Sequence, residues 1–514
     1  MVSPRPVHLQ KHGLAVGVAL VLLAWLAFPA GPAHAATFTV TKTTDTNDGA
    51  CNSDCSLREA VVAANAAGGA DTIEIPTGYY KLTISGNDDT SAAGDLDITS
   101  NLTLKAMGPV TVDGGGIDRV VHVLAGNATL SGLRITGGSM GAGGGINNFG
   151  GALTLTNSTV SGNESTGGGG GVYNFDGGIL TLTNTTVSGN QSDGFGGGIR
   201  NSGTATLTNS TVSGNEATGH GGGIYNPAGT VTLSDTTVSG NSADLNGGGI
   251  SNFGTVALSD TTVSGNQADL NGGGIANAGG TATITSSTIT ANRADADNNE
   301  TGDGGGVFRS GGTVSIGNTI LAGNDDGLNF HHPDCSGEVT SNGHNFIGDL
   351  DQCIVETQPT DDLGPVALGP LAFNGGPTET HALPAASQAV NHGPTSGTGS
   401  DQRGVPRPVG PAFDTGAYER VLCSGLLVNV VGTNARDILG GTARADGVLA
   451  QGGSDTVRSG TGNDKVCGGN GNDKLFGEGG SDTLLGQGGN DLLDGGPGSD
   501  VCVGGPGTNK QKSC

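Results

Sequence analysis

The chain has 514 residues, of which 100 are glycine, and its formal net charge is −26. This charge disfavours binding to the phosphates of nucleic acid, so we expect no nucleic-acid partner. The glycines do not follow a three-residue period, which excludes a collagen helix and indicates that many of them serve turns.

The N-terminus has the pattern of a secretory signal peptide. Arg5 and Lys11 precede an apolar stretch from about Leu14 to Phe28, and Ala33-His34-Ala35 offers small residues for cleavage. We therefore expect a secreted, extracellular protein, with association to the surface of a bacterial cell left open. Once the signal is removed, no remaining stretch is long and apolar enough to span a membrane.

A short helix is predicted soon after the signal. Ser56 and Glu59 have the spacing of a capping box, and the helix they open should end at about Ala66. The first strand should follow at Thr72-Ile73-Glu74-Ile75-Pro76. The segment Cys51–Ala60 resembles the CSLREA domain, which is found at the start of exported bacterial β-helix proteins. That resemblance implies a cap on the first coil of a solenoid.

A repeat of 25 to 32 residues fills the middle of the chain, from about Gly115 to Asn324. Each unit offers three short strands that point an aliphatic side chain the same way. One such rank follows the glycine runs at Ile146, Val172, Ile199, Ile224, Ile250, Ile275 and Val307. Stacking these units about 4.8 Å apart gives a parallel β-helix with continuous aliphatic ladders inside.

Asparagines recur two residues after these aliphatic positions, at Asn148, Asn174, Asn201, Asn226, Asn252 and Asn277. In register they can hydrogen-bond amide to amide along the stack, so we interpret them as structural. Gly170-Gly171-Val172, together with Val160-Ser161-Gly162-Asn163, resembles the GGAI and FxxN repeats of bacterial polymorphic outer-membrane adhesins.

Four motifs after the repeats resemble the choice-of-anchor Q domain, which implies a cap at the far end of the β-helix. They are Ser341–Asp349, Asn374–Thr378, Asp401–Gly404 and Asp414–Glu419.

Near the C-terminus, eight aspartates stand nine residues apart: Asp437, Asp446, Asp455, Asp464, Asp473, Asp482, Asp491 and Asp500. Around the last six the frame is close to GGxGxDxUx, where U is apolar. This resembles the calcium-binding nonapeptide of RTX proteins. Glycines permit tight turns with free carbonyls, and aspartate supplies a charged oxygen for a hard cation.

Two nonapeptides should form one coil of a parallel β-roll, with each calcium ion between neighbouring loops of one edge. The predicted metal-site residues are Asp455, Asp464, Asp473, Asp482, Asp491 and Asp500, with Gly453, Gly462, Gly469, Gly471, Gly480, Gly489 and Gly498. Ala435 and Arg444 replace the fourth glycine of the first two units, so we do not expect calcium at Asp437 or Asp446. We expect several ions, and calcium binding and folding should be one event.

Eight cysteines in an exported chain predict disulfides. Closeness in sequence favours Cys51 with Cys55, Cys335 with Cys353, Cys423 with Cys467, and Cys502 with Cys514.

Evidence for an active site is thin. The catalytic candidates are Asp269 and Asp295, which should stack with Asp244 on one turn, and the basic residue Arg309. Asp297, Glu300, Asp303 and Arg293 lie near them in sequence. We favour the interpretation of these acids as a solvated acidic turn that discourages aggregation. The pair His331-His332 has no second cluster with which to hold a metal. The only tryptophan lies in the signal peptide, which removes the preferred stacking surface for sugars.

The predicted fold is all-β: a right-handed parallel β-helix of the pectate-lyase type followed by an RTX parallel β-roll. The segments are residues 1–35 (signal), 36–75 (N-terminal cap), 76–347 (β-helix), 348–420 (C-terminal cap) and 421–514 (β-roll). We expect a monomer that acts as an adhesive or structural protein, with an extracellular surface, glycan or matrix as its partner. The alternatives are a secreted polysaccharide lyase or glycoside hydrolase, and a protein that only buffers or senses calcium.

Overall fold

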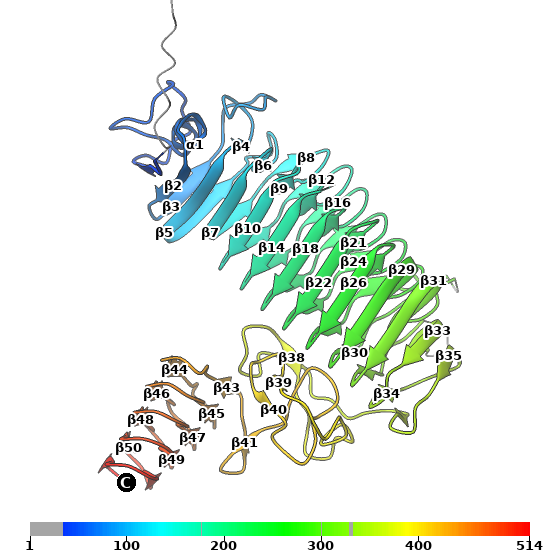
Figure 1. Ribbon diagram of the computed structural model, residues 1–514, viewed down its shortest axis with the longest axis vertical. Coiled ribbons are helices and arrows are strands. Elements are labelled where there is room, and N and C mark those ends of the chain that lie inside the picture. The colour runs from blue at the N-terminus through cyan, green and yellow to red at the C-terminus, as the bar shows by residue number, and fades with distance from the viewer. Residues whose placement is uncertain (1–33, 176, 300, 328–332) are drawn as a thin grey trace, which may run out of the picture.

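The computed structural model describes residues 34–175, 177–299, 301–327 and 333–514. Its described part is nearly all β, with one helix, α1 (Leu57–Ala66). A parallel β-helix is followed along the chain by an irregular segment and then by a smaller parallel roll (Figure 1). The order of the two solenoids is the predicted one.

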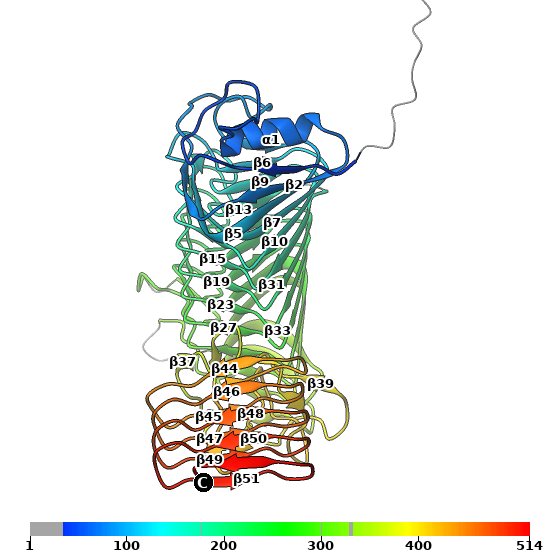
Figure 2. The ribbon, with the colours of Figure 1, turned by 90° about the vertical axis from the view of Figure 1, so that its left-hand side faces the viewer.

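The N-terminal part covers the first coil, and α1 lies across that end of the β-helix (Figure 2). Ser56 accepts the Glu59 backbone N–H, and the Glu59 carboxylate accepts the Ser56 N–H in return, which confirms the predicted capping box. Strand β1 (Thr37–Thr39), which the sequence analysis missed, pairs in parallel with β2 (Ala70–Ile75). It lies before the helix, where a three-residue strand leaves no periodic signal.

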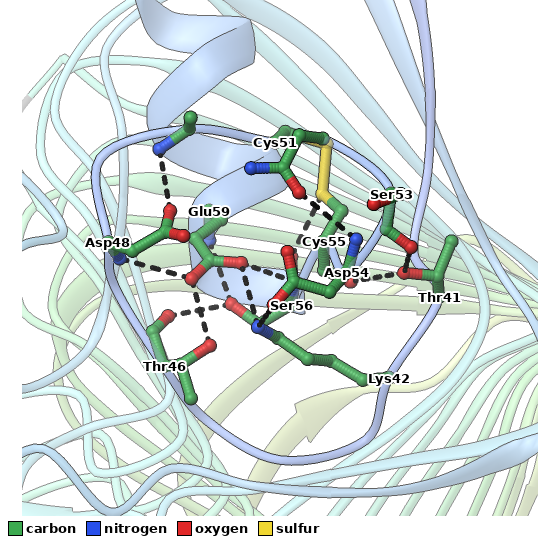
Figure 3. Close-up of a disulfide and its surroundings, with 12 residues drawn as sticks. Thr41, Lys42, Thr46, Asp48, Cys51, Ser53, Asp54, Cys55, Ser56 and Glu59 are labelled. Carbon is green, nitrogen blue, oxygen red and sulfur yellow. Dashed lines mark hydrogen bonds and ion pairs between the residues drawn. A yellow bond between two sulfur atoms is a disulfide. The ribbon is translucent and has the colours of Figure 1, made fainter.

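The cap loop is braced by the Cys51–Cys55 disulfide and by the buried Glu59 carboxylate (Figure 3). Glu59 also accepts hydrogen bonds from the Thr46 hydroxyl and the Asp48 N–H. Burial opposes ionisation of Glu59, yet these hydrogen bonds outweigh it and lower the pKa of the carboxyl.

Each coil of the β-helix contributes strands to parallel rows. The first row, named here the lateral row, contains β4 (Leu96–Ile98), β6 (Val121–Val123), β9 (Ile146–Asn148), β13 (Val172–Asn174), β17 (Ile199–Asn201), β21 (Ile224–Asn226), β25 (Ile250–Asn252), and the first parts of β29 (Ile275–Thr285) and β31 (Val307–Gly317). The second row contains β1, β2, the first parts of β5 (Asn101–Asp113) and β7 (Asn127–Thr136), β10 (Ala152–Thr156), β14 (Ile179–Thr183), β18 (Thr204–Thr208), β22 (Thr230–Ser234), β26 (Thr255–Ser259), the rest of β29 and β31, β33 (Cys335–Ser341) and β35 (Gln352–Glu356).

The third row contains β3 (Gly78–Lys81), the second parts of β5 and β7, β11 (Thr159–Ser161), β15 (Thr186–Ser188), β19 (Thr211–Ser213), β23 (Thr237–Ser239), β27 (Thr262–Ser264), β30 (Thr288–Thr290), β32 (Ile320–Leu321), β34 (Phe346–Ile347) and β36 (Asp362–Leu363). A short fourth row contains β8 (Ser139–Met140), β12 (Glu164–Ser165), β16 (Gln191–Ser192), β20 (Glu216–Ala217), β24 (Ser242–Ala243) and β28 (Gln267–Ala268). Coil strands thus continue to Leu363, past the predicted end at residue 347.

The interior is built from the predicted ladders. The aliphatic rank after the glycine runs is fully buried, with exposures of 0–1% from Ile146 to Val307. The asparagine ladder is also confirmed, because Asn174 Nδ2 donates to Asn201 Oδ1 at 2.8 Å and Asn201 Nδ2 donates to Asn226 Oδ1 at 3.0 Å.

After the last coil, the chain turns back along the third row. This segment includes β37 (Leu371–Ala372), β38 (Thr380–His381), β39 (Gly399–Ser400) and β40 (Pro406–Arg407). Thr262 Oγ1 donates to Gln402 Oε1 at 2.6 Å, and Ser264 Oγ lies 2.9 Å from His381 Nε2. The predicted C-terminal cap segment therefore packs against the side of the coils.

A charge pair in this contact, between buried Arg407 and partly buried Asp260, is expected to make stability depend on pH. Arg407 lies 3.4 Å from Asp260, and burial raises the pKa of Asp260 to about 7, although Arg407 opposes the shift and Asp235 and Asp401 add to it. A folded-state pKa above the ordinary value means that folding binds a proton. The contribution of Asp260 to stability is therefore largest at acidic pH and is lost as pH rises through the interval up to about 7.

We therefore expect Asp260→Asn to gain stability relative to the unmodified protein as the pH rises from about 5 to about 8. Asparagine tolerates the positive φ of 46° at this position. Thermal unfolding at both pH values measures the gain, and Asp193→Asn, at an exposed aspartate, is the control. If the difference in melting temperature between Asp260→Asn and the unmodified protein is the same at both pH values, the prediction is wrong.

The C-terminal roll has two narrow parallel sheets. One contains β43 (Val430–Val431), β45 (Gly447–Leu449), β47 (Lys465–Cys467), β49 (Thr483–Leu485) and β51 (Val501–Val503). The other contains β44 (Ile438–Gly440), β46 (Thr456–Arg458), β48 (Lys474–Phe476), β50 (Leu492–Asp494) and β52 (Lys510–Lys512). Successive nonapeptides alternate between the sheets, so two units make one coil, as predicted.

The core of the roll is one apolar side chain thick. Val448, Val457, Val466, Leu475, Leu484 and Leu493 are 0% exposed. A hairpin of β41 (Leu422–Cys423) and β42 (Leu426–Leu427) precedes it and is joined to β47 through Cys423–Cys467. The structure also joins the other predicted cysteine pairs, Cys51–Cys55, Cys335–Cys353 and Cys502–Cys514.

Candidate calcium site and lateral row

Each aspartate loop of the roll is hydrogen-bonded to the next loop on the same edge. The Asp455 N–H donates to Asp473 Oδ1 at 2.9 Å, and the Asp473 N–H donates to Asp491 Oδ1 at 3.0 Å. On the other edge, the Asp464 N–H donates to Asp482 Oδ1 at 2.9 Å. One oxygen of each carboxylate is thereby fixed, and the carboxylate plane is oriented before any ion arrives.

The second carboxylate oxygen, Oδ2, is buried without a hydrogen-bond partner among the described residues in all six predicted calcium-binding aspartates. These are Asp455, Asp464, Asp473, Asp482, Asp491 and Asp500. A buried acceptor that lacks a donor costs about 1–3 kcal/mol, and more when it is charged. Binding of a cation removes this cost.

The first two loops differ from the others. Asp437 Oδ2 accepts hydrogen bonds from the Thr433 N–H at 2.6 Å and hydroxyl at 2.9 Å. Asp446 Oδ2 accepts the same pair of bonds from Thr442, at 2.5 and 2.9 Å. In each of these two loops a threonine supplies the hydrogen-bond donors to Oδ2 that the other six aspartates lack. These are the two positions at which no calcium was predicted.

Burial raises the pKa of Asp473 to about 6, with the charges of Asp455 and Asp491 adding to the shift against the hydrogen bond from the Asp455 N–H. Burial likewise raises the pKa values of Asp464 and Asp482. The ionised stack is therefore costly without a counter-charge.

The predicted glycines let neighbouring loops of one edge approach each other closely. Gly471 has a φ of 137°, and a Cβ there would lie 1.4 Å from the carbonyl oxygen of Gly453. The other predicted glycines, Gly462, Gly469, Gly480, Gly489 and Gly498, also have positive φ. Carboxylate and carbonyl oxygens form the ligand set that calcium prefers, so the residues present fit this ion.

A second feature is an outward-facing line of side chains along the lateral row. Tyr173, Arg200 and Tyr225 are in register on β13, β17 and β21. The Arg200 guanidinium carbon lies 4.9 Å from the ring centre of Tyr173 and 5.9 Å from that of Tyr225. The charge is thus held between two aromatic rings, each about one strand spacing away.

Rings from the adjoining turns extend this line. Phe149 stacks on Phe175 at 4.9 Å, and Phe195 stacks on Tyr225 at 5.0 Å. Phe149 and Phe253 are 49% and 38% exposed. This surface was not predicted from the sequence, where only tryptophan was considered as a stacking residue for sugars. The signal was available one residue after Val172, Ile199 and Ile224.

The two acidic catalytic candidates lie on neighbouring turns, because the Asp295 N–H donates to the Leu270 carbonyl at 3.2 Å. Burial raises the pKa of Asp269, and the charges of Asp297, Asp244 and Asp295 add to the shift. Arg309 instead donates from Nε and Nη2 to the Gly312 carbonyl and lies 3.2 Å from Glu338. The Arg309 guanidinium is therefore engaged with Gly312 and Glu338, next to the second row of strands. Asp303 borders the turn, while Glu300 and the pair His331-His332 lie outside the described residues.

Comparison with known proteins agrees with the two solenoids. Residues 144–326 match the family described as right handed beta helix region. Residues 440–475, 449–484 and 476–510 match the RTX calcium-binding nonapeptide repeat. The predicted fold class is confirmed, and the chain carries RTX calcium-binding repeats.

Among solved structures, pectate lyase Pel9A is similar at 16% identity with a TM-score of 0.48, covering 76% of this chain and 98% of that one. The PL6 family alginate lyase AlyGC is similar at 12% identity with a TM-score of 0.34, covering 90% of this chain and 72% of that one. The search of curated proteins found no match. In the part of the chain that the structure describes, no helix has the length and apolarity needed to cross a membrane.

Proposed function

We propose that this chain is an exported adhesive or structural protein that binds glycans along its lateral row and folds its C-terminal roll with calcium. The observation that carries the proposal is the line formed by Tyr173, Arg200, Tyr225 and the neighbouring phenylalanines. The signal-peptide pattern supports export. Calcium outside the cell would then complete the roll after secretion.

The lateral row suits an extended acidic glycan. Aromatic faces pack against the apolar faces of sugar rings, while Arg200 offers a cation to a carboxylate or sulfate. Tyr173, Arg200 and Tyr225 follow one another on three neighbouring coils, and this regular spacing suits successive units of a polymer. Phe149 and Phe253 are exposed and Arg200 and Tyr225 are partly exposed, whereas Tyr173 is 8% exposed, so a glycan would reach the line mainly through the first four residues.

Binding of the full chain to immobilised acidic and neutral polysaccharides, with calcium present, tests the proposal. We expect Arg200→Ala to weaken binding to the acidic polymer by about tenfold, since one charge-assisted contact contributes about 1.5–3 kcal/mol. Tyr225→Ala should weaken binding to both polymers. Phe373→Ala is the matched control, because Phe373 is 68% exposed and lies in the segment beyond the coils. Equal binding by all variants would contradict the proposal.

The same polymers distinguish adhesion from depolymerisation. Release of uronate products that is lost in Asp269→Ala or Arg309→Ala would replace this proposal with the lyase alternative. Intact polymer after prolonged incubation would support adhesion.

A further inference from the structure

A cluster at the N-terminal end of the lateral row has no part in the calcium roll or in the aromatic line. Asp97 on β4 and His122 on β6 stand opposite each other in register. Asp89, on the loop before β4, brings a third group. One ligand atom from each of the three residues lies within 4.8 Å of the others, and among the described residues no other such group of His, Cys, Asp or Glu occurs.

The spacing of these atoms fits a small ion. His122 Nδ1 lies 3.3 Å from Asp97 Oδ1 and 3.7 Å from Asp89 Oδ1. Oxygen and nitrogen ligands at about 2.0–2.2 Å from a tetrahedral zinc ion are themselves about 3.4 Å apart. Both distances from His122 Nδ1 are close to that ligand–ligand separation.

Asp97 and His122 are buried, and each has a polar side-chain atom that makes no hydrogen bond among the described residues. Asp97 is 0% exposed, and its Oδ1, which faces His122, has no hydrogen-bond partner among the described residues. Its other oxygen accepts the Ser91 N–H at 2.7 Å, which fixes the carboxylate. His122 is 8% exposed. A fully buried carboxylate oxygen that faces an imidazole nitrogen at 3.3 Å without a hydrogen bond is the kind of group that a metal ion stabilises.

The loop that carries Asp89 is anchored by hydrogen bonds from Arg58 on α1. Arg58, which is 0% exposed, donates to the carbonyls of Ser91 at 3.2 Å, Gly94 at 2.8 Å and Asp95 at 3.1 Å. The site is thus preorganised by the N-terminal cap.

A neighbouring group can orient the imidazole. His122 Nε2 and Asn147 Oδ1 are both buried without partners among the described residues. Asn147 is the in-register neighbour of His122 on β9. When Nδ1 binds a metal, Nε2 carries the proton and needs an acceptor, and Asn147 is the neighbour in register that would offer one.

We propose that Asp89, Asp97 and His122 bind a divalent transition-metal ion of the zinc class, at a site distinct from the calcium roll. The imidazole selects against calcium, which takes oxygen ligands. Three protein ligands leave the fourth position of a tetrahedral ion to water. Because the Asp89 side chain is 73% exposed, that position opens to solvent.

Zinc uptake by the full, untagged chain tests the proposal. The protein is dialysed against zinc chloride with calcium in excess to occupy the roll, and bound zinc is then measured by elemental analysis. We expect His122→Ala to bind one zinc ion per chain less than the unmodified protein. Asp89→Ala should weaken zinc binding by at least about tenfold. Cobalt(II) in place of zinc should give the intense visible absorption of a tetrahedral site, and His122→Ala should abolish it.

Two controls separate this site from other zinc-binding groups. His220→Ala removes another partly buried histidine of the coils, and Asp54→Ala removes a cap carboxylate that is 61% exposed. Both should retain zinc. Because Asp89 is exposed, its variant tests the site even if replacement of His122 or Asp97 disturbs folding. Zinc uptake by the Asp89 and His122 variants equal to that of the controls would overturn the proposal.

Discussion

Replacement of Asp473 by asparagine is expected to remove about 5 kcal/mol of calcium-dependent stability from the roll. Asp473 is central on its edge, so its free Oδ2 would serve the ions on both sides. A site contributes about 2.7 kcal/mol when calcium exceeds its dissociation constant a hundredfold, and two sites are affected. Asparagine keeps the Oδ1 acceptor for the Asp455 N–H, so the hydrogen-bonded ladder remains.

The sign of the effect should reverse when calcium is chelated. Without the ion, the stacked carboxylates repel one another across a core that is one side chain thick, and removal of one charge relieves that repulsion. The Asp473→Asn variant should then be at least as stable as the unmodified protein. Thermal unfolding of the full chain, followed by far-ultraviolet circular dichroism with calcium and with chelator, measures both effects.

Asp437→Asn is the matched control for this experiment. It changes the same residue type on the same edge, but Asp437 Oδ2 already has the two hydrogen bonds from Thr433. Its calcium response should equal that of the unmodified protein. The same response from both variants, or no response of the roll to chelator, would contradict a calcium-stabilised roll.

The sequence predicted those parts of the molecule in which each unit copies the one before it. In a solenoid, the neighbour of Val172 is the residue one repeat later, Ile199, so periodicity alone identifies the contact. The same reasoning placed Asp473 between Asp455 and Asp491. The capping box at Ser56 needed only local spacing.

Features that depend on non-repeating contacts could not be predicted in this way. The packing of Gln402 against Thr262 joins residues 140 positions apart and has no periodic signature. Asp89 reaches His122 through an irregular loop. Arg309 was placed near the acidic turn by sequence distance, but its side chain turns toward Gly312 and Glu338.

The internal asparagine ladders should be among the most sensitive positions in the β-helix. Asn215 is 1% exposed and stands in a ladder at the turn after the third row. Its Oδ1 accepts the Asn190 N–H and Nδ2 at 3.0 Å each, while its Nδ2 donates to Val187 O at 3.0 Å and to Asn241 Oδ1 at 2.9 Å. Alanine removes all four bonds and leaves buried partners without replacements. We therefore expect Asn215→Ala to cost about 3–5 kcal/mol.

The loss should also be local, because coils of a solenoid stabilise mainly their nearest neighbours. Hydrogen exchange should rise in the coils that contain Asn190 and Asn241 and stay unchanged in the roll. Gln191→Ala is the control, since this amide is exposed and makes one side-chain hydrogen bond, to Glu216 at 3.2 Å. Its effect should stay within about 0.5 kcal/mol. Equal losses from Asn215→Ala and Gln191→Ala would show that burial of the ladder contributes nothing, and that the aliphatic ranks alone hold the coils together.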